Sequence, residues 1–284
     1  MDLHSGLPYW IIRNSLWDYF HPLEKDLSTD VVIVGSGITG ALMAHELCHA
    51  GIKCCIVDKR SIATGSSAAS TALLQYEIDV PLCRMAKIIG EENAATAYHA
   101  CLQSISDIKR VLEETGVNAG FEQLPSLFYA SSAADNKLLE QEHEIRQKHK
   151  LPVNLLEKKK IKEEYKVKTP GNALINEASA QMDAYRAATG LLAYHIKESG
   201  LKVFTHTSIK ECIETSDGCI MTTDRGHKIK CGYVTIATGF EAGQFLPQKI
   251  MDLTSTYALV SHPVASEHLW PTHCLIWETA DPYL

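Results

Sequence analysis

Three glycines near the start of the chain have the spacing of a phosphate-binding turn. They are Gly35, Gly37 and Gly40, and an acid, Asp58, follows after a helix-length interval. Gly35 permits a tight turn, Gly37 lets a pyrophosphate approach the backbone, and Gly40 lets a helix pack closely on a sheet. An acid at such a distance accepts hydrogen bonds from ribose hydroxyls. These residues predict a dinucleotide-binding site.

The segments around the glycines are those that such a site requires. Residues 31–34 are a continuous β-branched apolar run, typical of a strand buried in a parallel sheet. A helix with apolar residues at helical spacing follows and ends near Gly51. Residues 53–57 form a second apolar strand that stops at Asp58. We therefore expect a βαβ unit in which the positive N-terminal end of the helix faces the phosphates.

NAD and FAD share this fingerprint, so later segments must distinguish them. Residues 65–71 are small and rich in hydroxyls, and they open another helix. Such a segment offers donors along a pyrophosphate and ribityl chain that is longer than the pyrophosphate of NAD. A further buried strand, 233–237, returns to the sheet and ends in Ala-Thr-Gly. These features favour FAD, and a nicotinamide-dependent dehydrogenase remains the alternative.

Composition excludes several classes of protein. The chain has 284 residues, of which 45% are hydrophobic and 21% charged, so a folded protein of about two domains is expected. A net charge of −7 argues against a nucleic-acid partner, which needs a clustered basic surface. Nine cysteines without a CxxC pair favour reduced thiols. Because neither an export signal nor an apolar run of membrane-spanning length occurs, we predict a cytoplasmic protein without a membrane span.

Two other residue patterns are interpreted as structural. His45-Glu46-x-x-His49 matches the letters of a zinc-protease motif. The helix that carries it packs on the dinucleotide fold and no third ligand is indicated, so we predict no metal site. Cys54 and Cys55 are interpreted as packing residues of a buried strand. No pattern identifies catalytic residues.

The rest of the chain has the elements of an α/β protein. The sequence predicts a long amphipathic helix over 91–115, a strand over 121–130 interrupted by Pro125, and a charged helix over 136–150 whose charges face solvent. A strand from residue 173 leads to a helix over 184–199 with Asp183 as its N-cap. Short strands are expected at 201–204, 208–215, 219–223 and 227–230, before the strand at 233–237.

Taken in order, residues 30–40, 58–74, 182–186 and 233–239 resemble the FAD-dependent oxidoreductases of the D-amino-acid oxidase and glycine/sarcosine oxidase superfamily. The resemblance implies a doubly wound, Rossmann-like FAD domain interleaved with an α+β substrate domain on an antiparallel sheet. It places the FAD domain at 26–90 and 172–249, the substrate domain at 91–171 and 250–284, and a leader at 1–25.

The same resemblance implies a chemistry and a set of cofactor contacts. The family oxidises the C–N bond of an amino acid or secondary amine by hydride transfer to flavin N5, and O₂ or an electron carrier reoxidises the flavin. Asp58 stands where the family often has Glu. The contacts implied for this chain are Gly35, Ser36, Gly37, Ile38, Thr39, Gly40, Asp58, Lys59, Arg60, Ser66, Ser67, Ser70, Thr71, Leu73, Ser208, Ile209, Ala237, Thr238 and Gly239.

The resemblance covers only part of a family member. A substantial segment beyond the equivalent of Ala280 completes the substrate sheet in the family and supplies groups that face the flavin ring. This sequence resembles the N-terminal two-thirds, which implies that the isoalloxazine end of the site is largely absent from it. A non-catalytic FAD- or nucleotide-binding protein is therefore a third possibility.

Overall fold

The computed structural model describes residues 3–17, 19–246, 248–249, 252–269 and 271–280, which form two compact units. The described residues of Met1–Thr71, Leu112–Ala119 and Asp183–Leu259 make up the first unit. Those of Ala72–Val111, Gly120–Met182 and Val260–Leu284 make up the second. Of the predicted segments, residues 1–2 and 18 of the leader, 247 of the FAD domain, and 250–251, 270 and 281–284 of the substrate domain lie outside the described residues.

The compact units divide the chain at positions that differ from the predicted domain boundaries. Residues 72–90 and 172–182 belong to the second unit, whereas 112–119 and 250–259 belong to the first. The reason is strand pairing, since the strand that follows Ala72 and the strand that ends at Gln181 pair with each other. The assignment of FAD to one unit and substrate to the other stays a prediction.

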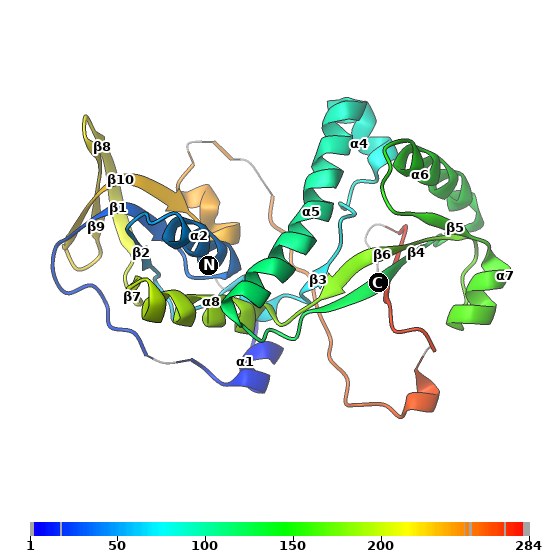
Figure 1. Ribbon diagram of the computed structural model, residues 1–284, viewed down its shortest axis with the longest axis horizontal. Helices are drawn as coiled ribbons and strands as arrows, with labels where there is room; N and C mark the ends of the chain where they lie inside the picture. Colours follow the sequence, from blue (N-terminus) through cyan, green and yellow to red (C-terminus); the bar gives the residue numbers. More distant parts are fainter. Residues whose placement is uncertain (1–2, 18, 247, 250–251, 270, 281–284) are drawn as a thin grey trace. The chain divides into compact units, whose positions relative to one another are not determined.

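The first unit is built on a six-stranded mixed sheet (Figure 1). At its centre β1 (Leu27–Val34) lies between β2 (Cys54–Val57) and β10 (Lys228–Ile236), and all three strands are parallel. Beyond β2, β7 (Lys202–Phe204) continues the parallel part. Beyond β10, β9 (Gly218–Thr223) and β8 (Ile209–Thr215) form an antiparallel extension. The predicted α/β dinucleotide-binding fold is confirmed.

One strand prediction in this sheet is wrong. Residues 227–230 and 233–237 were expected to form two strands, but β10 runs without a break from Lys228 to Ile236. The pairing explains why, because Cys231 is opposite Thr29 of β1 and Tyr233 is opposite Val31. The ladder with β1 therefore continues across residues 231–232, which separated the two predicted strands.

Three helices of the first unit lie where the sequence predicted helices, namely α2 (Ile38–His49), α3 (Ser66–Ala69) and α8 (Ala184–Glu198). The sequence analysis did not predict α1 (Tyr9–Asn14) or the 3₁₀ turn at Gly239–Gln244. Helix α8 packs against α2, and Asp183 caps α8 by accepting a hydrogen bond from Arg186 N at 2.9 Å, as predicted. The buried core of the sheet comprises Leu23, Val32, Val34, Cys55, Val57, Met221, Ile229 and Cys231.

The described part of the N-terminal segment is bound to the first unit by specific hydrogen bonds. Trp10 Nε1 donates to Ser70 O at 2.7 Å, and Asn14 Nδ2 donates to Asp183 Oδ2 at 2.6 Å. Trp17 N donates to the Tyr185 hydroxyl at 2.9 Å. These contacts attach the segment to α8 and to the hydroxyl-rich stretch around α3.

The second unit contains a five-stranded sheet. Its central strands β4 (Glu122–Tyr129) and β6 (Ala173–Gln181) are antiparallel, and β3 (Leu73–Leu74) and β5 (Asn154–Leu156) also pair antiparallel with β6. The register of β4 shifts at Pro125, which has no N–H to donate. The predicted antiparallel sheet is thus found in β3–β6, and β11 (Leu275–Glu278) adds a strand that pairs parallel with β4.

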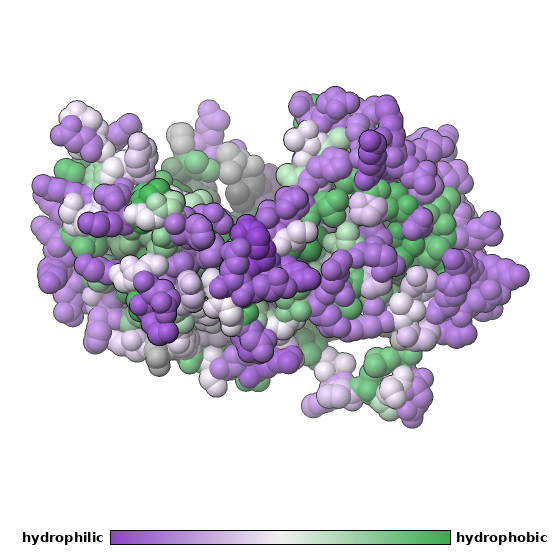
Figure 2. Space-filling model, viewed as in Figure 1, coloured by the Kyte–Doolittle hydropathy of each residue, from purple (hydrophilic) through white to green (hydrophobic). Residues whose placement is uncertain are grey.

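Helices of the second unit are α4 (Leu82–Ile89), α5 (Glu91–Thr115), α6 (Asn136–Lys148) and the short α7 (Lys158–Lys160), with a π turn at Ile161–Tyr165 and 3₁₀ turns at Ala133–Asp135 and Ser266–His268. The last residues of α5, from Leu112 onward, belong to the first unit. Tyr98 and Ile105 of the predicted apolar stripe of α5 are buried. Hydrophilic residues predominate on the visible face, with apolar residues gathered in smaller areas (Figure 2). Within the described residues, no helix is both long and apolar enough to span a membrane.

Candidate functional site

The glycine motif forms a tight turn between β1 and α2. Gly35 has a φ of 110°, and a Cβ there would overlap the carbonyl oxygen of Ala237. A Cβ at Gly40 would overlap the carbonyl oxygen of Gly35, so the first turn of α2 lies against the loop. Gly37 occupies the N-cap position of α2. Backbone N–H groups at a helix N-terminus bind anions, and the missing side chains keep this end of α2 open.

Two other predicted segments meet the glycine turn. A Cβ at Gly37 would lie 2.9 Å from Ser67 Oγ, and one at Gly239 would lie 3.5 Å from Ser66 Oγ. Ser67 Oγ accepts a hydrogen bond from Ile38 N at 2.9 Å. The structure therefore brings the turn, the start of α3 and the Ala-Thr-Gly end of β10 together, although they lie far apart in the sequence.

Asp58 is bound to the glycine turn on one side and to its own loop on the other. Its Oδ2 accepts hydrogen bonds from Ser36 N at 2.7 Å and Ser36 Oγ at 2.6 Å, while Oδ1 accepts one from Arg60 N at 2.8 Å. The sequence assigned Ser36 and Asp58 to the site but did not predict the hydrogen bonds between them. A carboxylate offers about four lone-pair positions, and three are used here, so Asp58 retains capacity for about one further hydroxyl donor.

Lys59 and Arg60, both predicted as cofactor contacts, pair with an acid that the sequence analysis missed. Glu241 Oε1 is 2.6 Å from Lys59 Nζ, and Glu241 Oε2 is 2.8 Å from Arg60 Nη1. The Glu241 side chain is 5% exposed. Hydrogen bonds from Arg60 and then Lys59, against the opposing effect of burial, lower the pKa of Glu241 to about 2. Its place just after Gly239 is the only signal that the sequence offered.

Thr238 carries a buried hydroxyl that lacks a hydrogen-bond partner within the described part of the chain. Leaving such a group unsatisfied costs about 1–3 kcal/mol. The residue lies between Ala237 and Gly239, which contact the glycine turn and the start of α3 respectively. An unsatisfied hydroxyl at this point is what a site completed by a ligand would contain.

The remaining predicted contacts are distributed less uniformly. Thr207 N donates to Asp58 O at 2.9 Å, which holds the chain just before Ser208 and Ile209 beside the acid. Ser70 follows α3, and its carbonyl accepts the hydrogen bond from Trp10. Thr71 is exposed and ends the first unit. Leu73 belongs to β3 of the second unit and is 45% exposed. Thr39 lies exposed in the first turn of α2.

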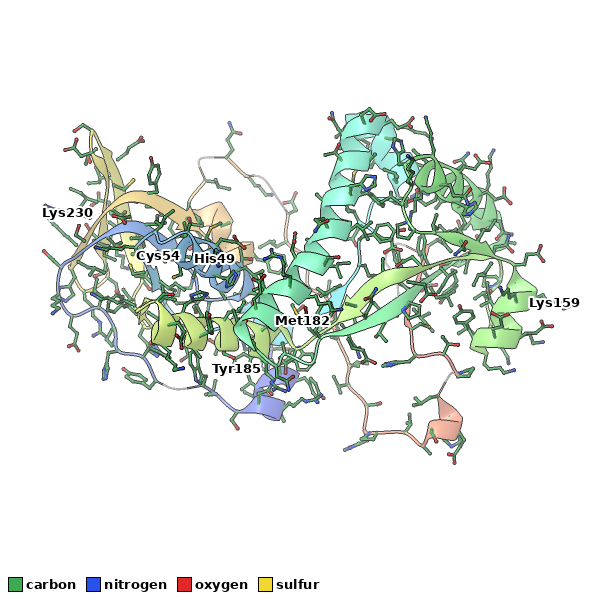
Figure 3. The ribbon with its side chains drawn as sticks, viewed as in Figure 1. His49, Cys54, Lys159, Met182, Tyr185 and Lys230 are labelled. Carbon is green, nitrogen blue, oxygen red and sulfur yellow. The ribbon has the colours of Figure 1, made fainter. Side chains whose placement is uncertain are left out.

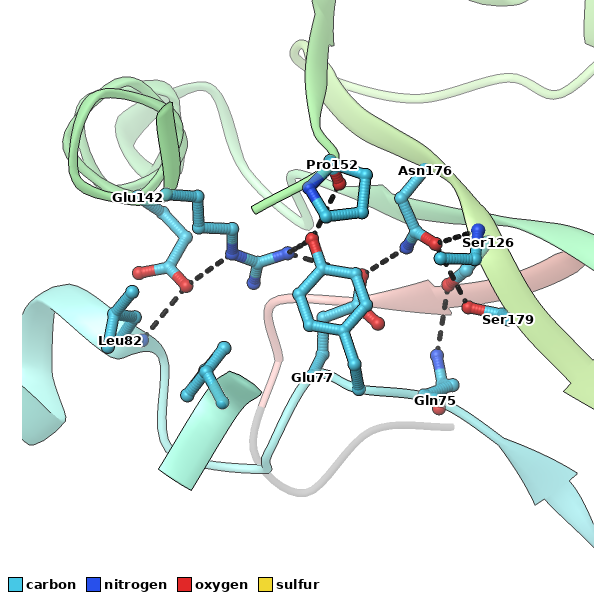
Figure 4. A network of polar contacts seen from close by, with 12 residues as sticks. Gln75, Glu77, Leu82, Ser126, Glu142, Pro152, Asn176 and Ser179 are labelled. Atoms are coloured by element: carbon cyan, nitrogen blue, oxygen red, sulfur yellow. Dashed lines mark hydrogen bonds and ion pairs between the residues drawn. The ribbon is translucent and has the colours of Figure 1, made fainter. Parts of the chain in front are cut away.

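The second unit contains a buried polar network centred on Arg146 (Figure 4). Arg146 Nε is 2.7 Å from Glu142 Oε1, and Arg146 Nη1 is 3.2 Å from Glu77 Oε1. Glu142 also accepts hydrogen bonds from Leu82 N at 2.9 Å and Cys83 N at 2.8 Å at the start of α4. The prediction that all charges of this helix face solvent is wrong, because these two α6 side chains are at most 1% exposed.

Two buried polar atoms of this network, Glu77 Oε2 and Arg146 Nη2, have no hydrogen-bond partner among the described residues. Asn176 Nδ2 donates to Glu77 Oε1 at 2.5 Å, and burial raises the pKa of Glu77 against the lowering effect of Arg146. Asn176 also lines a cavity of about 500 Å³ together with Pro152 and Glu177. The network ties α4 and α6 to the sheet of the second unit.

Comparison with known proteins identifies the class to which this chain belongs. The family model described as FAD dependent oxidoreductase matches residues 30–283, so the chain is a member of that family. The match includes the glycine turn, Asp58 and the Ala-Thr-Gly segment. It decides between the flavin and nicotinamide alternatives, and FAD is the cofactor.

Individual relatives and solved structures are similar to most of this chain, and the solved structures share its fold. A Bacillus subtilis protein named for a Rieske 2Fe-2S iron–sulfur centre is 23% identical over 232 residues, covering 82% of this chain and 44% of its own length. Glycine oxidase from Geobacillus kaustophilus has a TM-score of 0.65 at 22% identity, covering 76% of this chain and 57% of the other. L-Proline dehydrogenase from P. horikoshii has a TM-score of 0.64 at 23% identity, covering 80% and 58%. The chain thus spans about half the length of these proteins.

Proposed function

We propose that this protein is an oxidoreductase that uses FAD to oxidise the C–N bond of an amino acid or a secondary amine. The observation that carries the proposal is the family match to residues 30–283 over a glycine turn whose geometry excludes side chains. The related structures are titled as enzymes of glycine and L-proline, which supports an amino acid or cyclic amine as substrate.

The residues of the first unit fit an adenine dinucleotide. The remaining N–H groups at the N-terminus of α2, beside Gly37, would bind the pyrophosphate, and the remaining lone pair of Asp58 would accept a ribose hydroxyl. The buried hydroxyl of Thr238, which has no partner among the described residues, would gain one from the cofactor. Bound FAD supplies the acceptor for a hydride. The chain's own part is to hold the dinucleotide in one orientation and to exclude water from it.

Spectroscopy of the purified chain tests the cofactor, and anaerobic mixing tests the reaction. We expect flavin absorbance near 450 nm that bleaches when glycine, sarcosine, L-proline or a D-amino acid is added without oxygen. Reoxidation by O₂ or by an artificial electron carrier then distinguishes an oxidase from a dehydrogenase.

Two outcomes would count against the proposal in different ways. A protein that binds FAD stoichiometrically but is not reduced by any member of the panel would support the non-catalytic alternative. A protein that binds no flavin while remaining folded would overturn the assignment of the site itself.

A further inference from the structure

A cluster of thiol, hydroxyl and imidazole groups lies where α2, β2 and α8 meet, apart from the residues assigned to FAD. Cys48, in the last turn of α2, has its Sγ 3.8 Å from the Sγ of Cys54 at the start of β2. Both cysteines are half-buried. Figure 3 labels Cys54 and His49 at this α2–β2 connection. The two sulfurs must approach from 3.8 Å to about 2.05 Å for a disulfide to form.

Three more groups extend from Cys48 into the core. Ser199 lies beside Cys48 and contributes to lowering its pKa, and Ser199 Oγ is 3.0 Å from His195 Nδ1. His195 Nε2 is in turn 3.0 Å from His45 Nδ1, and both imidazoles are buried. With protons assigned to the two Nδ1 atoms, His45 donates to His195 and His195 donates to Ser199. The Ser199 hydroxyl proton is then available to the nearby Cys48 sulfur, and a donor beside a thiolate stabilises it.

The ionisation of the two thiols is unequal. The contact with Cys54 lowers the pKa of Cys48 to about 7 against the effect of burial, and Ser199 adds to the lowering. The same contact, together with burial, raises the pKa of Cys54. Of the two adjacent thiols, Cys48 therefore ionises first, and Cys54 is the partner thiol 3.8 Å away.

We propose that Cys48 and Cys54 form a peroxide-reactive dithiol that closes to a disulfide. The Cys48 thiolate attacks one oxygen of the peroxide, the O–O bond breaks, and the departing hydroxide takes up a proton to become water. The Cys54 thiol then attacks the sulfenic sulfur, so that the S–S bond forms, the S–O bond breaks and a second water leaves. Two thiols are oxidised and one hydrogen peroxide is reduced to two waters.

Cys55 is the neighbouring thiol that this assignment must exclude. Successive side chains of a strand point to opposite faces, so Cys55 is directed away from Cys54 and Cys48. Cys55 belongs to the buried core of the sheet and is 1% exposed, and burial raises its pKa to about 12. Its replacement by Ser therefore tests whether the vicinal position contributes.

Peptide mapping tests the disulfide directly. The full chain is reduced, freed of reductant, treated with hydrogen peroxide, alkylated and digested with trypsin. We expect residues 26–53 to be linked to residues 54–59. The link should persist in Cys55→Ser and disappear in Cys54→Ser, where dimedone should instead label Cys48. A link that persists in Cys54→Ser, or that is lost in Cys55→Ser, would overturn the assignment.

Alkylation rates at pH 7 give a second test that does not depend on disulfide formation. Cys101 is the matched control, because it is also half-buried and burial raises its pKa. About half of Cys48 would be thiolate, against about 1% or less of Cys101, and the lower nucleophilicity of a weaker base reduces this advantage to about fivefold. We expect Ser199→Ala to raise the apparent pKa in the pH profile of Cys48 alkylation. Equal rates for Cys48 and Cys101 would contradict the proposal.

Discussion

Replacing Gly37 by Ala separates binding of the cofactor from stability of the fold. The φ of Gly37 is −71°, which Ala adopts without strain, so the backbone tolerates the change. The new Cβ would lie 2.9 Å from Ser67 Oγ, and the hydroxyl must move away from Ile38 N. Loss of that hydrogen bond costs about 1 kcal/mol of folding free energy. The fold should therefore survive.

The effect on FAD should be larger than the effect on folding. A methyl group at the N-cap of α2 lies in the path by which a pyrophosphate approaches the N–H groups. Losing one hydrogen bond to a charged phosphate costs about 1.5–3 kcal/mol, which is about tenfold to a hundredfold in Kd. We expect this loss in a titration of the apoprotein with FAD, followed by quenching of flavin fluorescence, with urea unfolding measured in parallel.

Gly51→Ala is the matched control for this experiment. Gly51 has a φ of 73° and open space around its Cβ position, so Ala costs about 1 kcal/mol through backbone strain alone. It leaves the glycine turn untouched and should bind FAD with the affinity of the original protein. The reasoning is refuted if Gly37→Ala binds FAD normally, or if both variants lose FAD to the same extent.

Three further predictions concern stability. Glu241→Gln should destabilise the apoprotein by about 1–2 kcal/mol at pH 7, a value reduced for the partial exposure of its cationic partners. Because the folded pKa is about 2 against 4.5 ordinarily, urea midpoints of the two proteins should converge as the pH falls from 4.5 toward 2. Arg146→Met should cost about 3–5 kcal/mol in urea unfolding, since Glu77 and Glu142 would be left buried without their cation, and a loss below 1 kcal/mol would contradict this. Burial, reinforced by the neighbouring histidines, lowers the pKa of His195, so the free energy of unfolding should decline as the pH falls below 6.5. His195→Gln should flatten that part of the pH profile of stability. An unchanged profile in the variant would be evidence against this role of His195.

Local sequence was sufficient for the elements that form the glycine turn. A tight turn, a close approach of helix and strand, and a helix N-cap each depend on residues within a few positions. The roles of Gly35, Gly40 and Asp183 could therefore be predicted from the sequence. The apolar strands beside them predicted the parallel sheet because burial on both faces leaves a continuous apolar run. Residues 231–232 show the limit, because local sequence did not indicate that pairing with β1 would carry one strand across them.

What only the tertiary structure decided is the choice of partners between distant residues. Nothing in the sequence near Lys59 or Arg60 indicates Glu241, and the charges of α6 gave no sign that Glu142 and Arg146 are enclosed while their neighbours are solvated. Likewise, nothing in the sequence near Cys48 indicates that Ser199 lies beside it. The spacing of charged and thiol side chains along the sequence does not indicate which residues they will contact. The energy of such a contact depends on the distance between the two groups and on their burial, and folding sets both. The sequence therefore determined the glycine turn, whereas the packing of distant segments determined the buried ion pairs and the surroundings of Cys48.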